Sequence, residues 1–338
     1  MTKIYLIRHA EAEGNLYRLA HGHYNSALTP RGYRQLAYLR RRFRDIHIDA
    51  VYGSDLLRTQ TTASAIYADK NLPFHPMPLL REVNLGWWDP LSWGEVARRD
   101  RAMYDHYNQR PHLFYVEGGE TFPQVQERMI EGLKQIAREN PGASVVATSH
   151  AAAIRATLGL IKNIPLDEIG STTYSGNTGV TLLEVTGDEI RVVFERDSSH
   201  LPDHEVTKRR VKPGAIATAT APGFWYHPEQ ETADSCSLQA FLDDTFAGRI
   251  AMEAEENALR ITEYEIAPEL RGQRYGMQPI GQAIQYARTK GLEDVILTCG
   301  EDTAGFFTRY GFRETGRSGG GVDLTLDVRQ IVREIPEL

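Results

Sequence analysis

Cysteine, long apolar runs and an excess of positive charge are all scarce in this chain of 338 residues. Cys236 and Cys299 are too few for a disulfide framework, and neither stands in a C-x-x-C pair or beside histidine at metal-ligand spacing. With 38 Lys and Arg against 45 Asp and Glu, the formal charge is −7, which argues against a nucleic-acid binder. No apolar run approaches the ~20 residues that cross a bilayer. We therefore expect a cytoplasmic protein with no metal site, membrane contact or nucleic-acid partner.

The length of the chain predicts two domains, because a single hydrophobic core rarely grows past roughly 250–300 residues. Residues 1–204 alternate apolar runs such as Lys3–Arg8 and Ser144–Ser149 with amphipathic stretches such as the one opened by Thr29-Pro30. This order is typical of an α/β fold with a mostly parallel sheet between helices. Residues 205–222 show no sustained period and are expected to be a linker, and residues 223–338 are expected to form a second, smaller domain.

Three of the predicted strands end in side chains that suit an anion. Arg8-His9 ends the first, Ser54-Asp55 with Arg58 one turn later ends the second, and Ser149-His150 ends the third. In an open α/β sheet, ligands bind beyond the carboxyl ends of the strands. Arginine presents a planar fork that matches phosphoryl oxygens, and a histidine with one ring nitrogen fixed keeps the other lone pair for attack on phosphorus. The sequence therefore predicts a phosphate pocket at this edge.

About the first 200 residues carry an ordered series of motifs, namely Leu6-Ile7-Arg8-His9-Ala10-Glu11, Asn15, Leu28-Thr29-Pro30-x-Gly32, Ser54-Asp55-Leu56-x-Arg58-Thr59, Leu80-x-Glu82-x-x-x-Gly86-x-Trp88, Gly118-Gly119-Glu120-Thr121, Ser149-His150-Ala151-x-x-Ile154-Arg155 and Ser198-Ser199-His200-Leu201. This series resembles the histidine phosphatase superfamily, which has the phosphoglycerate mutase-like fold. The resemblance implies a three-layer α/β/α domain that binds a small-molecule phosphomonoester.

The resemblance also assigns roles to the matching residues. It implies that His9 is the nucleophile and forms a phosphohistidine. It implies that Arg8 and Arg58 hold the phosphoryl oxygens, that His150 stabilises the charge of the transition state, and that Asn15 adds a neutral donor. No metal is needed in this scheme, because the cationic side chains neutralise the phosphoryl charge.

Glu82 has two roles in the same resemblance. It protonates the leaving alkoxide and then acts as the base on the water that hydrolyses the intermediate, so it has to be protonated near neutral pH. Ala10 and Ala151 depart from the family, which usually has glycine there. Asp89-Pro90 replaces the common Glu-Gly, and we expect this change to alter the specificity rim rather than the chemistry.

The segment between Glu82 and His150 lacks the longer insertion of the family's mutases. We therefore expect a metal-independent phosphomonoester hydrolase, and mutase-type phosphoryl transfer is the alternative. The segment is rich in aromatic residues, which predict either a lid for apolar substrates or a part of the core: Trp87, Trp88, Trp93, Tyr104, Tyr107, Phe114 and Tyr115. Earlier in the chain, His21-Gly22-His23 could suggest a metal site, but it has no acidic partner and is expected to be a surface loop.

In the second domain, Arg271-Gly272-Gln273-Arg274-Tyr275-Gly276 follows the strand-like Ala258–Ile266 and opens a helix that runs to about Lys290. Such a loop points backbone N–H groups at a pyrophosphate. With the strand Asp294–Thr298 and a closing F-x-x-x-G-F pattern, it resembles the GNAT acetyltransferase family over roughly Leu259–Phe312. The resemblance implies an α+β fold in which Arg271, Gly272, Gln273, Arg274, Tyr275 and Gly276 bind acetyl-CoA.

Two residues of this domain depart from the GNAT pattern. Arg274 stands where the family loop has its first glycine, and Phe307 stands where a tyrosine often protonates the leaving thiolate. Water or Tyr310 could substitute for that tyrosine. The expected function of this domain is acetylation of a small amine, and a non-catalytic acyl-CoA sensor is the alternative.

Overall fold

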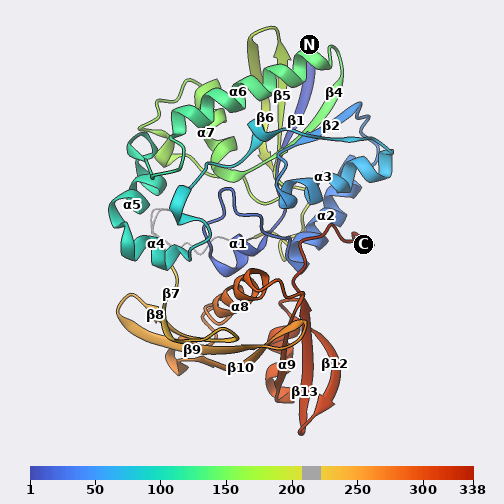
Figure 1. The fold of residues 1–338 in the computed structure, drawn as a ribbon. Helices are drawn as coiled ribbons and strands as arrows, with labels where there is room; N and C mark the ends of the chain where they lie inside the picture. The colour runs from blue at the N-terminus through green and yellow to red at the C-terminus, as the bar shows by residue number, and fades with distance from the viewer. Residues whose placement is uncertain (208–221) are drawn as a thin grey trace.

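The computed structural model describes residues 1–207 and 222–338. Most of the predicted linker, residues 208–221, lies outside the described residues. Figure 1 shows one domain built from the first two hundred residues and a second one that follows it, with helix α8 (Gln278–Thr289) at the boundary between the two.

The first domain is built on a six-stranded sheet of order β3-β2-β4-β1-β5-β6. Its first four strands in that order are parallel, and β5 and β6 join as an antiparallel edge. The strands are β1 (Thr2–Arg8), β2 (Ala50–Gly53), β3 (Phe74–Pro76), β4 (Ser144–Ser149), β5 (Val180–Thr186) and β6 (Glu189–Asp197). Every residue of β4 after Ser144 is buried, as its apolar run predicted for a strand covered on both faces.

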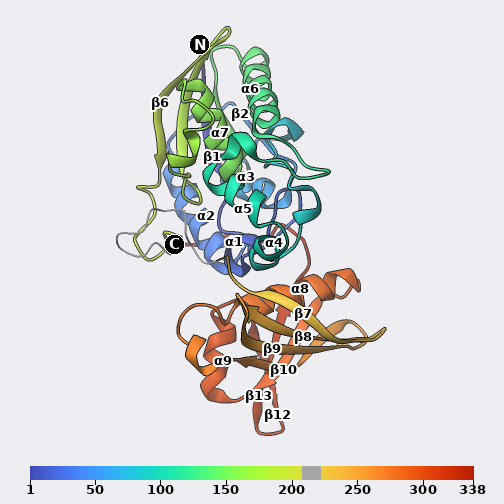
Figure 2. The same ribbon diagram turned by 90° about the vertical axis from the view of Figure 1, so that its left-hand side faces the viewer.

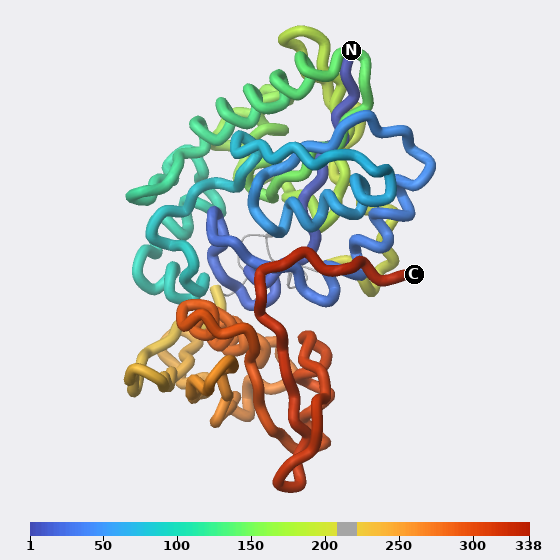
Figure 3. The backbone as a smooth tube through the Cα atoms, turned by 45° about the vertical axis from the view of Figure 1, so that its right-hand side comes forward, coloured from blue at the N-terminus to red at the C-terminus, as the bar shows by residue number. Residues whose placement is uncertain are grey.

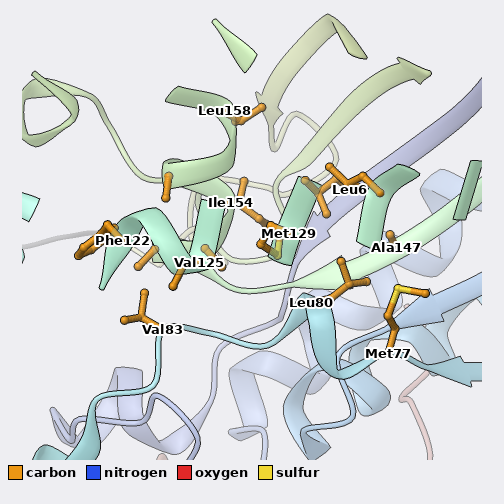
Figure 4. Close-up of a cluster of buried hydrophobic side chains, with 14 of the residues drawn as sticks. Leu6, Met77, Leu80, Val83, Phe122, Val125, Met129, Ala147, Ile154 and Leu158 are labelled. Carbon is orange, nitrogen blue, oxygen red and sulfur yellow. The ribbon is translucent and has the colours of Figure 1, made fainter. Parts of the chain in front are cut away.

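Helices cover both faces of this sheet, which confirms the predicted α/β/α layers. Ile4 and Leu6 of β1 face the cluster that holds α6 and α7, whereas Ile7 faces the one that holds α2 and α3. Figure 4 shows the first of these clusters, where Met129 and Ile154 pack beside Leu6. The helices are α1 (Glu13–Tyr17), α2 (Pro30–Phe43), α3 (Leu57–Lys70), α4 (Trp93–Arg99), α5 (Arg101–Gln109), α6 (Phe122–Glu139) and α7 (Ala151–Ile161).

The second domain is a seven-stranded sheet of order β12-β13-β11-β10-β9-β8-β7, a mixed α+β fold as predicted. Strands β10 and β11 are parallel, but they pair only over Ala258–Arg260 and diverge beyond that point. The elements are β7 (Trp225–Glu231), β8 (Ser235–Leu242), β9 (Thr245–Ala254), β10 (Ala258–Ile266), α8, β11 (Asp294–Cys299), α9 (Glu301–Thr308), β12 (Arg313–Ser318) and β13 (Gly321–Asp327).

The two domains pack tightly through α1 and α8, which lie against one another in Figures 1 and 2. Tyr17 of the first domain belongs to the apolar cluster of the second. A Cβ on Gly281 would lie 2.5 Å from the Cβ of Tyr17, so only glycine allows this approach of the helices. Arg288 donates two hydrogen bonds of 2.8 Å to the carboxylate of Glu13, and both side chains are largely buried.

The last residues of the chain return to the first domain, as Figure 3 shows. The Arg333 backbone N–H donates to the Tyr33 hydroxyl (3.1 Å), and Arg40 donates to the Pro336 carbonyl (3.2 Å). At the other boundary, the buried Glu205 accepts from Arg34 at 2.6 Å, so the start of the predicted linker packs against α2. No helix in residues 1–207 or 222–338 is long and apolar enough to cross a bilayer.

Candidate active site

His9 directly follows β1 and is 2% exposed. Its Nδ1 lies 2.7 Å from the carbonyl of Ala10, which can only accept, so Nδ1 carries the proton and Nε2 keeps a free lone pair. Burial, followed by the charges of Arg58 and Arg8, holds the pKa of His9 well below its usual range. The structure therefore presents a neutral imidazole with its nucleophilic nitrogen available at neutral pH.

His150 stands at the N-terminus of α7, with its ring centroid 5.3 Å from that of His9. Its Nδ1 accepts a hydrogen bond from Arg58 Nε (3.2 Å), which places the proton on Nε2. That Nε2 has no partner among the described residues. Burial, then the charges of Arg58 and His9, lowers the pKa of His150 well below its usual range. The ring is therefore a neutral donor held next to the nucleophile.

Arg58 is completely buried and supports the site from below. Besides its bond to His150, it donates three hydrogen bonds of 2.7–2.9 Å to backbone carbonyls of residues 21–24, and it is not among the residues that line the cavity. Burial lowers its pKa to about 10, so the guanidinium stays charged at neutral pH. Arg8 lies in the cavity wall and donates from Nη1 to the Ser175 carbonyl at 2.6 Å.

Glu82 is buried at the N-terminus of α7 and accepts three backbone hydrogen bonds. The donors are the N–H groups of Val83 (3.0 Å), Ala152 (3.1 Å) and Ala153 (2.8 Å). Two of these bonds come from the first turn of α7, so the carboxyl group is fixed in the wall of the cavity. The structure thus holds Glu82 where it can exchange a proton with a ligand.

Asn15 and the predicted surface loop meet next to the nucleophile. The ring of His21 lies 5.8 Å from that of His9 and lines the cavity, so the surface-loop prediction is wrong. Asn15 Nδ2 lies 3.3 Å from His21 Nε2 and His21 Nδ1 lies 3.0 Å from Ser26 Oγ, which fixes the ring. A Cβ on Gly14 would lie 2.2 Å from the His21 ring, so only glycine leaves room for this ring. The glycine beside Asn15 was therefore the one feature of the sequence that could have indicated the position of His21.

Asp89, expected to alter only the specificity rim, holds the loop that carries His21. Its carboxylate accepts from the backbone N–H groups of Gly22 (2.8 Å), His23 (2.6 Å) and Tyr24 (3.1 Å). Asp89 is therefore a positioning residue, which motif matching missed because these contacts join segments far apart in the sequence.

The aromatic segment is mainly core. Trp88 is fully buried, and its ring packs edge-on against those of Trp93 and Phe114 at 6.1 and 5.3 Å. Only three of these side chains reach the cavity, namely Trp93, Tyr104 and Tyr107, among the residues that the structure describes.

A cavity of about 530 Å³ opens at these groups. From the first domain it is lined by Arg8, His9, Asn15 and Glu82 among others, and from the second by Arg274, Met277, Arg309 and Tyr310. Within residues 1–207 and 222–338, no group of three His, Cys, Asp or Glu side chains is placed to hold a metal ion.

The predicted acetyl-CoA loop, Arg271–Gly276, is engaged by its own domain. Arg271 donates to the Ile266 carbonyl at 2.8 Å, and the ring of Tyr275 stacks on Phe224 at 5.3 Å. Gln273 donates from its side chain to a carbonyl of the preceding turn. Gly272 and Arg274 have left-handed backbones, with φ of +70° and +62°. Arg274 itself faces the phosphatase cavity.

Aromatic side chains also surround this loop. The Tyr264 hydroxyl donates to the Gly276 carbonyl, and the rings of Tyr264, Phe306 and Phe307 pack against one another at 4.9–6.2 Å. A Cβ on Gly276 would lie 3.4 Å from Phe306. Residues 271–274 are exposed, and the loop departs from the family's pyrophosphate-binding pattern at Arg274, where a side chain stands at the first glycine position.

Comparison with known families agrees with both resemblances. Residues 4–198 match the histidine phosphatase superfamily (branch 1), and residues 208–312 match the acetyltransferase (GNAT) family. Because the first match covers more than half of the chain, this protein belongs to the histidine phosphatase superfamily and carries a GNAT-family domain. The fold, the site and the family assign the first domain to phosphatase or phosphoryl-transfer chemistry.

Individual relatives match the first domain. Phosphoserine phosphatase 1 of Hydrogenobacter thermophilus is 29% identical over 171 residues, which cover 51% of this chain and 81% of the relative. The metal-independent phosphoserine phosphatase of Arabidopsis thaliana is 31% identical over 159 residues, 46% of this chain and 67% of the relative. The solved structure of Bacillus stearothermophilus YhfR has a TM-score of 0.57 at 32% identity and covers 59% of this chain and 99% of that one.

Proposed function

We propose that the first domain hydrolyses small-molecule phosphomonoesters through a phosphohistidine on His9. The observation that carries the proposal is the pairing of two neutral histidines with fixed tautomers. His9 offers a lone pair on Nε2, and His150 offers an unpartnered Nε2–H beside it. A phosphoryl group between them meets a nucleophile on one side and a donor on the other.

In the first step, Nε2 of His9 attacks phosphorus, and the bond from phosphorus to the ester oxygen breaks. Glu82 gives its proton to the leaving oxygen, so the product alcohol departs neutral. The charge on the phosphoryl oxygens is met by Arg8, which lines the cavity, and by the Nε2–H of His150, whose ring Arg58 holds in place. Asn15 supplies a neutral donor at the same wall.

In the second step, Glu82 takes a proton from water, whose oxygen attacks phosphorus as the bond from phosphorus to His9 Nε2 breaks. Orthophosphate leaves, His9 is again a neutral imidazole, and Glu82 again holds a proton. The three backbone donors hold the Glu82 carboxyl group in place through both steps.

Phosphate release from p-nitrophenyl phosphate and from a panel of alkyl phosphates, in excess chelator, tests this proposal. We expect turnover together with a phosphoenzyme on His9, trapped by a denaturing quench at alkaline pH, where the phosphorus–nitrogen bond survives. No turnover on any ester, or a label on another residue, would overturn the proposal. Mutase activity, the second candidate, would instead move phosphate between positions of a sugar acid with little free orthophosphate.

For the second domain, acetyl transfer is implied by the GNAT-family match, and we derive no chemical step for it from the structure. The GNAT-family match favours it, whereas Arg274 in the loop and Phe307 at the position of the family's tyrosine oppose it. Phe307 is buried and has no proton to give to a thiolate. Calorimetry of the full chain with acetyl-CoA, followed by an acetylation assay on small amines, separates an enzyme from a binder and from a domain that does neither.

A further inference from the structure

The second domain forms part of the wall of the phosphatase cavity. Arg274 and Met277 reach it from the loop before α8, and Arg309 and Tyr310 reach it from the end of α9. These residues lie some 260–300 positions along the chain from His9, in a domain from a different family. The cavity of about 530 Å³ has room for a ligand larger than a phosphate and a short alcohol, since pockets for whole small molecules begin near ~300 Å³.

The charge of this wall is strongly positive, and part of it is not neutralised. On the first-domain side, Arg31 pairs with Glu11 at 3.3 Å and Arg34 pairs with Glu205 at 2.6 Å. The side chains of Arg274 and Arg309 form neither a hydrogen bond nor an ion pair with any residue in 1–207 or 222–338. Both guanidinium groups are exposed and solvated, so they are available to an anion in the cavity.

Tyr310 marks the point where these charges meet. Burial raises the pKa of its hydroxyl, the charges of Arg309, Arg274 and Arg31 lower it, and Glu11, the partner of Arg31, raises it. Tyr310 and these three arginines from two domains line the same cavity. The mutual repulsion of the arginines is relieved when a ligand places negative charge between them.

The backbone of Arg274 strengthens this interpretation. Its φ of +62° lies in the left-handed region, where a side chain is disfavoured and glycine is not. A residue without a Cβ would suit this turn better, yet the chain has arginine there. The strained backbone directs a cationic side chain into the neighbouring domain's cavity.

The contacts between the two domains hold Arg274 and Arg309 in a defined position relative to His9. The buried pair of Arg288 with Glu13, and the contact of Gly281 with Tyr17, fasten α8 to α1. Gly311 also packs on the first domain, where a Cβ would lie 3.1 Å from Pro30. The position of Arg274 and Arg309 relative to His9 therefore sets a length that a ligand has to match.

We propose that the GNAT-family domain is the substrate-selecting wall of the phosphatase, with Arg274 and Arg309 binding a second anionic group of the phosphomonoester. The substrate class is an ester with a phosphate at the reacting end and a phosphate or carboxylate at the other. This inference rests on the proposed hydrolysis at His9. Arg274, which replaces the first glycine of the GNAT-family loop, thus binds the substrate of the phosphatase domain.

A ladder of synthetic esters tests the proposal in the full chain. The α,ω-alkanediol bisphosphates are compared with ω-hydroxyalkyl phosphates of the same length by kcat/KM, corrected for the two equivalent phosphates. We expect a preference for the bisphosphates of about tenfold or more at one length, because a charge-assisted contact is worth that much. Esters with an ω-carboxylate show whether the second group is a phosphate or a carboxylate, and ω-ammonium esters are expected to be the poorest.

Variants assign the preference to the two arginines. Arg274→Gln and Arg309→Gln should each reduce the ratio of bisphosphate to hydroxyalkyl kcat/KM several-fold. Arg313→Gln, an exposed arginine of the same domain outside the cavity, should leave the ratio unchanged. Arg274→Gly removes the charge and relieves the backbone, so a reduced ratio in this variant does not come from unfolding.

Equal kcat/KM for the two series at every length, or a ratio that none of the arginine variants changes, would overturn the proposal while hydrolysis itself stands. If wild-type protein releases no phosphate from p-nitrophenyl phosphate, the hydrolase proposal fails instead, and the two failures are distinguishable. A preference that disappears equally in Arg313→Gln would show a general effect of surface charge.

Discussion

Two segments of this chain run from a parallel strand through a short loop into a helix, and each resembles a phosphate-binding loop. After β4, His150 keeps an unpartnered Nε2–H beside the free lone pair of His9. After β10, the loop carbonyl of Gly276 accepts from Tyr264, and Tyr275 stacks on Phe224. The first segment leaves the ring N–H of His150 unpartnered beside His9, whereas the second uses its Gly276 carbonyl within its own domain and sends the Arg274 side chain to the cavity of the other domain. A loop motif becomes an anion site only where the fold leaves such groups unpaired.

The largest effect that this comparison predicts follows from His9→Ala. Removing the nucleophile should lower phosphate release at least about a thousandfold, since covalent catalysis depends on that one atom. His47→Ala, which removes a histidine whose side chain is 83% exposed, is the matched control and should keep full activity. Activity in His9→Ala within tenfold of wild type would mean that the first segment is no more functional than the second.

Glu82→Gln is expected to have the next largest effect. The amide preserves the size of the side chain but neither gives nor takes the proton, so alkyl phosphates should be hydrolysed about a hundredfold more slowly. Aryl phosphates have better leaving groups and should lose less in the first step. Steady-state rates on a matched pair of esters check this expectation, and equal losses on both would argue against the acid role.

Much of the fold could be predicted from local pattern. The apolar run of β4 and the Thr29 cap with Pro30 at the start of α2 placed those elements where they lie, since Thr29 Oγ1 accepts from the Gly32 N–H at 3.1 Å. The candidate site residues carried family motifs, and the structure gathers those of the first domain at the ends of β1 and β4.

Other features depend on contacts between distant segments. Asp89 holds residues 22–24, the ring of His21 packs on Gly14, and Arg309 reaches the cavity of the other domain. None of these residues shows its role in its neighbours along the chain. The predicted acetyl-CoA loop illustrates the converse, since its motif is visible in the sequence but the stacking of Tyr275 on Phe224 and the approach of Arg274 to the other domain's cavity are not.

The buried histidines predict a pH effect on stability that is specific to the first domain. Burial holds the pKa values of His9, His21 and His150 well below their usual range, so the folded state keeps them neutral. The unfolded chain protonates them below about pH 6.5, and therefore binds more protons than the folded state. The free energy of unfolding should fall as pH drops from about 6.5 towards the folded-state pKa values.

Urea denaturation in buffers without phosphate, between pH 8 and pH 5, checks this effect. His150→Asn should flatten the dependence, because one of the three neutral histidines is then gone. A free energy of unfolding that rises as the pH falls below about 6.5 would contradict the neutral tautomers on which the mechanism rests.

The smallest expected effect concerns the second loop itself. Arg274→Gly restores the glycine that GNAT-family loops carry at this position and removes the left-handed side chain. We expect no binding of acetyl-CoA by calorimetry in the wild type, because a side chain stands where glycine lets the pyrophosphate approach the backbone. Tight binding in the wild type would contradict the contrast between the two segments. Binding only in the variant would show that Arg274 alone separates this loop from an acetyl-CoA site.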